Sequence, residues 1–219
     1  RLVVLIGRHV STVSAAGRGE TMSPSEFWGD EHFDRGRLAD QLPWPDLRGA
    51  RCLDIGTADG YWAFEMERRG AADVLATDRP SYYQQRARTV FAAVESNVRY
   101  EERSVYDLEG DFDVAFMGYV LQVVEDPVGA LRSVARVART LLLLDTISLP
   151  LALVPAPLAR LDARRDGGEW FVFNPRGMRK VVELAGWKVE AQSAILRDPW
   201  DTSWKGRAGI RGRSSALRA

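Results

Sequence analysis

The sequence predicts an α/β fold in which helices cover both faces of a mostly parallel sheet. From residue 50 onward, short apolar or β-branched runs alternate with segments of helical periodicity, which is the pattern of repeated β-α units. Residues 140–144 are almost all leucine, as in a central parallel strand that is buried on both faces. With 219 residues, 46% of them hydrophobic, the chain can bury one sizeable core.

The expected strands and helices are bounded by Gly and Pro residues. The strands cover residues 50–55, 74–77, 98–104, 112–117, 140–144 and 187–196. The helices cover residues 61–69, 81–95, 127–138 and 177–185. Pro127 suits the first turn of its helix, and Gly70 and Gly186 suit the positions just after a helix end. Because ligands of such sheets bind at the carboxyl ends of the strands, we expect the functional site there.

The arginine-rich residues 207–218 allow two interpretations. They form either a basic arm that contacts nucleic acid or a last strand of the sheet. Apolar residues alternate with the arginines in this segment, which favours the strand. On this interpretation Arg207, Arg211 and Arg213 point into solvent on the last sheet edge, and their replacement should leave activity nearly unchanged.

The N-terminal part of the chain has a different character. Residues 1–21 mix a short apolar run with Ser, Gly and Arg and show no clear period, whereas Met22 is a natural start. We interpret residues 1–21 as an appendage or an upstream extension; the alternative is a genuine N-terminal strand and loop. Residues 1–47 are assigned to this N-terminal part, which could form a lid over the site, and residues 48–219 to the main domain.

Charge and cysteine content exclude several classes of protein. Thirty basic and thirty acidic residues give a net charge of zero, so no global charge attracts polyanions or an anionic membrane. The single cysteine, Cys52, rules out a disulfide framework or a multi-cysteine zinc site within the chain. No apolar stretch reaches the roughly 18 residues of a membrane span. We expect a cytoplasmic protein without a bound metal.

A polar turn follows the first expected strand. Residues 53–60 read Leu-Asp-Ile-Gly-Thr-Ala-Asp-Gly, and the glycines allow the backbone to approach a ligand at the start of a helix. Asp78 ends the second strand, where a carboxylate can bridge two ribose hydroxyls. The pair of features indicates a nucleoside-containing cofactor.

The charge of this turn separates two cofactors. A dinucleotide site would carry Gly-x-Gly-x-x-Gly to bring a helix N-terminus against the pyrophosphate. Here Gly56 and Gly60 stand four residues apart, and Asp54 and Asp59 are in the turn. Acidic side chains repel a pyrophosphate but suit an ammonium and a sulfonium group, which favours S-adenosyl-L-methionine over NAD.

These residues, with the later Phe-Asp-Val at 112–114, resemble class I S-adenosylmethionine-dependent methyltransferases over about residues 48–196. The resemblance implies a Rossmann-like fold with a mostly parallel seven-stranded sheet, helices on both faces and an antiparallel last strand. Four segments are similar to the branch that contains the tRNA wobble-uridine carboxymethyltransferases: residues 59–71, 76–78, 104–108 and 170–175. That branch tends to carry a Tyr-His pair where this chain has Gln122 and Val123.

The resemblance also implies a set of cofactor-binding residues. Asp54 and Gly56 line the methionine end and Asp78 takes the ribose. Ser104, which stands where an acidic residue is common, flanks the adenine with Val105. The full expected set is Asp54, Gly56, Thr57, Gly60, Asp78, Arg79, Ser104, Val105, Met117 and Gly118. A carboxylated cofactor is an alternative, since Arg79 or Arg86 could pair with the added carboxylate.

Residues for the chemistry are harder to assign, because methyl transfer depends mainly on placing the acceptor and a base is optional. Tyr119 follows the fourth strand at the expected rim, and His32 could act from a lid. A half-buried tyrosine and a surface histidine are the plainer interpretations. The long connection 148–174 supplies two candidate substrate residues, Trp170 and Asn174.

The sequence therefore predicts transfer of a methyl group from S-adenosyl-L-methionine to a small-molecule acceptor. A tRNA base, methylated or carboxymethylated, is the main alternative acceptor. A non-catalytic adenosylmethionine-binding module and an NAD-linked enzyme are the other two classes considered.

Overall fold

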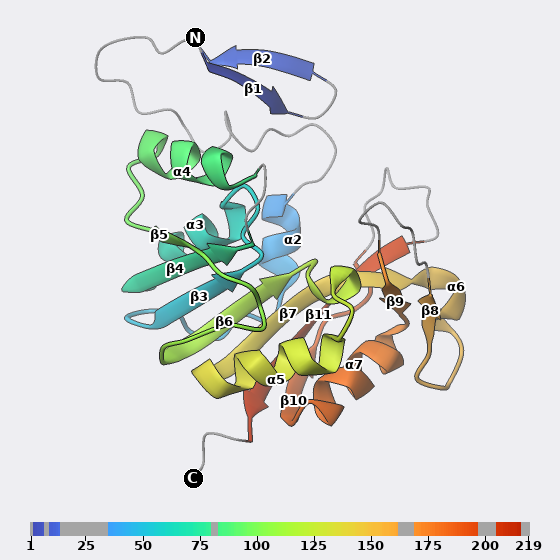
Figure 1. Cartoon of the computed structure of the whole chain (residues 1–219). Helices are drawn as coiled ribbons and strands as arrows, with labels where there is room; N and C mark the ends of the chain where they lie inside the picture. The colour runs from blue at the N-terminus through green and yellow to red at the C-terminus, as the bar shows by residue number, and fades with distance from the viewer. Residues whose placement is uncertain are drawn as a thin grey trace.

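The computed structural model describes residues 2–6, 9–13, 35–79, 83–161, 169–196 and 205–215. The described residues form a nine-stranded sheet with helices on both faces (Figure 1). Its seven main strands are β3 (Arg51–Ile55), β4 (Asp73–Asp78), β5 (Arg99–Glu102), β6 (Phe112–Gly118), β7 (Ala138–Ser148), β10 (Trp187–Gln192) and β11 (Lys205–Ser214). They lie in the order β10-β11-β7-β6-β3-β4-β5.

The strand directions confirm the predicted fold class. Neighbouring strands from β5 to β7 run parallel, whereas β11 is antiparallel to both β7 and β10. The C-terminal segment is thus a strand of the sheet, as the alternation of its residues predicted. The all-leucine part of β7 is fully buried, as expected for a central strand.

The predicted position of the last strand was wrong, because β11 lies inside the sheet and not at its edge. It pairs with β7 on one side and with β10 on the other, with Arg207 opposite Thr146 and Arg213 opposite Thr140. A fully buried β7 needs backbone partners along both of its edges, and β11 supplies one of them. The arginines of β11 are consequently not a solvent-facing row: Arg207 and Arg211 are only partly exposed.

The connection after β7 also differs from the prediction. Strand β7 continues beyond residue 144 to Ser148, so Asp145 lies within the strand and faces Ala208 of β11. The segment expected to be a long loop contains three short elements: helix α6 (Leu149–Ala152) and strands β8 (Ala159–Leu161) and β9 (Phe171–Phe173). Pairing of β9 with β7 extends the sheet from seven strands to nine.

The helices lie close to their predicted positions. They are α3 (Tyr61–Arg68), α4 (Tyr83–Ala93), α5 (Pro127–Val137) and α7 (Pro175–Leu184). A single 3₁₀ turn, η1 (Leu121–Val123), was not predicted. The side chains of Asp126 and Asn174 cap α5 and α7 by accepting hydrogen bonds from backbone amides at 2.8 and 2.7 Å.

Two apolar layers hold the helices to the sheet. One layer joins α5 and α7 to one face, and Trp187 donates a hydrogen bond to the Leu131 carbonyl there at 3.1 Å. The other joins α2 (Arg35–Gln41), α3 and α4 to the opposite face. In this second layer the Phe116 ring stacks against both Trp44 and Trp62, with centroid separations of 5.5 and 4.8 Å, and the two indole rings are themselves 6.4 Å apart.

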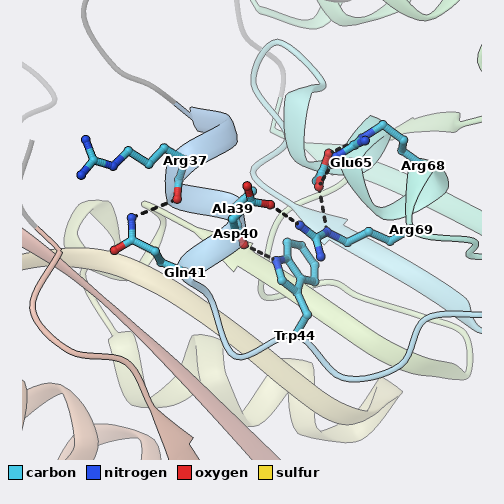
Figure 2. A network of polar contacts seen from close by, with 8 residues as sticks. All are labelled: Arg37, Ala39, Asp40, Gln41, Trp44, Glu65, Arg68 and Arg69. Carbon is cyan, nitrogen blue, oxygen red and sulfur yellow. Dashed lines mark hydrogen bonds and ion pairs between the residues drawn. The ribbon is translucent and has the colours of Figure 1, made fainter.

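A polar network attaches α2 to α3 (Figure 2). Glu65 is 4% exposed and accepts a hydrogen bond from Nε of Arg69 at 2.7 Å. The Arg69 guanidinium lies 4.8 Å from the centroid of the Trp44 ring and 3.4 Å from the Asp40 carboxylate. A buried carboxylate is tolerated here because cationic donors satisfy it.

The N-terminal region is described only in part. Strands β1 (Leu2–Ile6) and β2 (His9–Val13) pair in a separate two-stranded sheet, and Met22 and His32 lie outside the described residues. Three leucines of residues 35–47 are buried in the second apolar layer: Leu38, Leu42 and Leu47. The domain boundary at residue 48 stays a prediction. None of the described helices is long and apolar enough to cross a membrane.

Candidate cofactor and acceptor site

The turn after β3 is held tightly against β4. The backbone amides of Gly56 and Thr57 donate to the Thr77 carbonyl at 2.8 and 3.0 Å, and the Gly60 amide donates to Thr57 at 2.8 Å. The Thr77 hydroxyl donates to the carbonyl of Asp54 at 3.1 Å. These contacts place the predicted turn residues together at the carboxyl ends of β3 and β4.

Two positions in this turn require glycine. Gly56 and Gly60 have φ values of +71° and +85°, a region that side chains disfavour. A Cβ atom on Gly56 would clash with Cγ2 of Val120, and one on Gly60 would lie 2.6 Å from the Phe91 ring. Gly56 thus lets the turn meet the loop that follows β6.

Asp54 is the most deeply buried carboxylate of the turn, with 1% exposure. Its Oδ2 atom has no hydrogen-bond partner among the described residues. Burial raises the pKa of Asp54 to about 7 and the nearby carboxylates of Asp78 and Asp59 add to the rise, while hydrogen bonds from the Thr57 side chain and the Ala63 amide oppose it. A buried carboxylate oxygen without a protein partner suits a cationic or hydrogen-bond-donating ligand group.

Asp78 and Asp59 complete an acidic cluster. Asp78 Oδ2 accepts the Ala58 amide at 2.9 Å, and burial raises the pKa of Asp78. Asp59 binds Nη1 of Arg35 through both oxygens, at 2.8 and 2.9 Å. Since a carboxylate offers about four acceptor sites, Asp78 retains capacity for ligand hydroxyls.

The end of β6 carries a strained residue. Tyr119 has a φ value of +59°, which is unusual for a bulky side chain and is common at functional sites. Its amide donates to the Leu144 carbonyl at 2.8 Å, and the Arg207 guanidinium lies 5.6 Å from its ring centroid. Burial raises the pKa of Tyr119 to about 12, while the charge of Arg207 and its side-chain hydrogen bond to the tyrosine act to lower it.

Asp145 lies beside the loop that follows β6, and its carboxylate binds backbone amides. Its carboxylate accepts hydrogen bonds from the amides of Thr146 at 2.7 Å and Gln122 at 3.3 Å. Burial raises the pKa of Asp145 to about 7, while these amides oppose the rise. The Gln122 carbonyl in turn accepts the Trp170 amide at 2.6 Å, so one carboxylate anchors the turn to which the Trp170 segment is attached.

The remaining residues of the predicted cofactor set are spread around this edge. Ser104 is exposed and its hydroxyl accepts the Tyr106 amide at 3.3 Å, while Val105 packs against the core. The Met117 side chain is wholly buried in the core. A Cβ atom at Gly118 would lie 2.6 Å from the Phe116 ring, so this position has no room for a side chain. Arg79 is exposed, and the side chain of Arg86 is outside the described part.

Of the two predicted substrate residues, only one is available to a ligand. Trp170 is 38% exposed. Asn174 is wholly buried: its oxygen accepts the amides of Leu158 and Gly177, and its nitrogen donates to backbone carbonyls, including that of Leu151 at 3.0 Å. These bonds occupy its amide, so we leave Asn174 out of the acceptor site.

Sequence reasoning missed two cations that the fold brings to the site. Arg35 binds Asp59 and lies with its guanidinium 5.3 Å from the Tyr61 ring centroid. Arg207 was expected in solvent and lies over Tyr119. The sequence of β11 contained no signal for this position, because Arg207 shares a sheet face with the buried Thr146 only through the pairing of β11 with β7.

Comparisons with known proteins agree with this arrangement. A family model described as a methyltransferase domain matches residues 31–192. A ubiquinone biosynthesis O-methyltransferase from Xanthomonas oryzae is 32% identical over 174 residues, which cover 71% of this chain and 70% of the relative. One from Neisseria meningitidis is 35% identical over 100 residues, covering 43% and 42% of the two chains. Both relatives are O-methyltransferases by name, and neither belongs by name to the tRNA wobble-uridine branch.

Solved structures support the fold. An S-adenosylmethionine-dependent methyltransferase from Mesorhizobium loti superposes with a TM-score of 0.61 at 17% identity, covering 81% of this chain and 96% of the other. The N-terminal domain of EvdMO1, solved in the presence of SAH and D-fucose, superposes with a TM-score of 0.57 at 18% identity, covering 83% and 82%. The chain therefore belongs to the S-adenosylmethionine-dependent methyltransferases.

Proposed function

We propose that this methyltransferase acts on a hydroxyl oxygen of a small aromatic molecule. The observation that carries the proposal is the extent of similarity to proteins named ubiquinone biosynthesis O-methyltransferase, at 32% identity over about 70% of both chains. Their name denotes methylation of oxygen on a small molecule. The zero net charge of the chain gives no global attraction for tRNA, which favours the same acceptor class.

The acidic turn fits the cofactor. We assign the orphan oxygen of Asp54 to the cationic methionine end of S-adenosyl-L-methionine and Asp78 to the ribose hydroxyls. Gly56 and Gly60 keep the turn close to the cofactor, and Ser104 is assigned to the adenine. When bound, S-adenosyl-L-methionine supplies a methyl group activated by its sulfonium sulfur, so the protein mainly has to place and ionise the acceptor.

The acceptor side is assigned to the edge formed by the carboxyl ends of β6 and β7 and the amino end of the antiparallel β11. Tyr119 supplies a strained aromatic side chain, and Trp170 an exposed indole on the segment that is tied to Gln122. Flat apolar side chains with few polar groups suit an aromatic ring. His32, the other predicted catalytic candidate, stays a prediction.

A transfer assay tests the acceptor class. The protein is incubated with S-adenosyl-L-methionine and simple catechols, and the methylated product is identified by mass spectrometry. Cofactor binding by calorimetry without methylation of any phenol would overturn the proposal. The tRNA alternative is tested alongside: we expect tRNA to bind no tighter than about 10⁻⁵ M at physiological salt, the range of non-specific association. Submicromolar, sequence-selective binding would establish that alternative.

A further inference from the structure

Arg207 is placed at the functional edge by the topology of β11. Because β11 runs antiparallel to β7, its first residues lie at the carboxyl end of β7, where Arg207 is opposite Thr146. Its amide and carbonyl both bond to Leu196 at 2.8 Å, and its Nη1 donates to the Gly206 carbonyl at 3.0 Å. These contacts hold the guanidinium at the same edge as the end of β6.

The guanidinium meets Tyr119 at that edge. The distance from Arg207 to the ring centroid is 5.6 Å, within the range of a cation–π contact. The charged groups that act on Tyr119 come from three elements: Arg207 from β11, Asp145 from β7 and Arg35 from α2. Arg35 is held by Asp59 at 2.8 Å, and Asp145 by backbone amides. A fixed cation and a partly buried aromatic ring therefore adjoin at the end of β6.

We propose that Arg207, seated on Tyr119, binds the acceptor hydroxyl oxygen in its ionised form and so makes it nucleophilic at neutral pH. The inference rests on the proposed function and specifies its acceptor as a phenol that binds as phenolate. An aromatic hydroxyl ordinarily has a pKa of about 10. A guanidinium within contact distance lowers such a pKa by about 1 to 3 units. The proton leaves to solvent water as the phenolate binds, so no protein base is needed.

The test uses 4-nitrocatechol, whose absorbance differs between its neutral and ionised forms. The probe is titrated with pH on the full-length protein saturated with S-adenosylhomocysteine, which allows binding without transfer. We expect the wild-type protein to lower the pKa of the bound probe by about one unit or more, equivalent to at least about tenfold stronger binding of the phenolate. Arg207→Gln should abolish this shift.

Two further variants separate charge from packing. Arg213→Gln changes an arginine of the same strand whose side chain is 59% exposed beside Glu190, and it should leave the shift intact. Arg207→Lys keeps the charge and should retain part of the shift. An undiminished shift in Arg207→Gln would overturn the inference and leave the proposed function standing. Equal loss in Arg207→Gln and Arg207→Lys, with unchanged thermal stability, would assign Arg207 to packing and overturn it as well.

Transfer kinetics supply an independent readout. In Arg207→Gln the rise of kcat/KM with pH should move to higher pH, and acceptors that are already ionised at neutral pH should recover most of the lost rate. Failure of the wild-type protein to bind any ionisable phenol, while it still binds S-adenosylhomocysteine, would overturn the proposed acceptor class and this inference together.

Discussion

The proposed site has two ends: the cofactor end lies above β3 and β4, and the acceptor end lies above β6, β7 and β11. Each end contains a carboxyl that is 1% exposed and whose pKa is raised to about 7. Asp54 at the cofactor end has an oxygen without a partner among the described residues. Asp145 at the acceptor end accepts amides at 2.7 and 3.3 Å. Burial alone therefore does not identify a ligand-binding carboxyl; the partners of its oxygens do.

The two ends also differ in charge. Three aspartates surround the turn after β3, and one of them is neutralised by Arg35. The acceptor end places the Arg207 cation over an aromatic ring. On the proposed function, the acidic end would bind the cationic cofactor and Arg207 would bind an anionic acceptor oxygen, so one sheet edge would bind two ligands of opposite charge.

The largest expected effect is that of Asp54→Asn on cofactor affinity. Removal of one charge from a buried pair costs about 3 to 5 kcal/mol, so S-adenosyl-L-methionine binding should weaken at least about a hundredfold by calorimetry. Asp40→Asn, which changes an exposed carboxylate on α2, is the matched control. Affinity close to wild type in a folded Asp54→Asn variant would show that its orphan oxygen is not a ligand group.

The raised pKa of Asp54 adds a pH dependence. Between the reference value of 3.8 and about 7, the folded state retains a proton that the unfolded state releases. Stability of the ligand-free protein should therefore fall as pH rises through this window. Cofactor affinity should rise through pH values near 7, because the cation favours ionised Asp54. Both trends should be weaker in Asp54→Asn.

Gly56→Ala tests the contact between the two ends. A side chain in this backbone region costs about 1 to 2 kcal/mol, and the clash with Val120 adds about 1 to 3 kcal/mol. Gly49 has a similar φ of +73° with nothing near its Cβ position, so Gly49→Ala should show only the first cost in urea unfolding. Gly56→Ala with Val120→Ala should recover part of the loss; equal stability of the two single variants would contradict the contact.

Asp78→Ala should weaken cofactor binding and leave the fold intact. Charged hydrogen bonds to two ribose hydroxyls contribute about 1.5 to 3 kcal/mol, which corresponds to about ten- to hundredfold in affinity. Titration of a variant with an unchanged melting temperature measures this. An unchanged affinity would remove Asp78 from the site.

The smallest effect on cofactor affinity is expected from Asp145→Asn. Asparagine retains an oxygen for one of the two amides and places an NH2 group against the other, so the free energy of unfolding should fall by about 1 to 3 kcal/mol. Cofactor affinity should stay at the wild-type value, in contrast to Asp54→Asn. A large loss of affinity would mean that the acceptor-end carboxyl also serves the cofactor.

Much of the fold and the conformation of the turn after β3 followed from local pattern. The leucine run of β7, the helix start at Pro127 and the Gly56–Gly60 turn were predictable because burial, capping and backbone conformation are short-range properties. The sequence predicted that the strand would end at residue 144, before the charged Asp145, whereas β7 continues to Ser148. Asp145 is tolerated inside the strand because backbone amides donate hydrogen bonds to its carboxylate. The Asn174 amide is occupied by backbone groups that are distant in sequence, which no local pattern could indicate.

The layered α/β architecture, the strand-end positions of Asp54 and Asp78 and the acidity of the turn after β3 could be predicted without the fold, because each depends on residues that are neighbours in the chain. The position of β11 between β7 and β10 could not, and with it the contact of Arg207 with Tyr119, 88 positions earlier in the chain. Strand order is set by pairing and packing across the whole sheet, and no local pattern in the C-terminal segment specifies its neighbours.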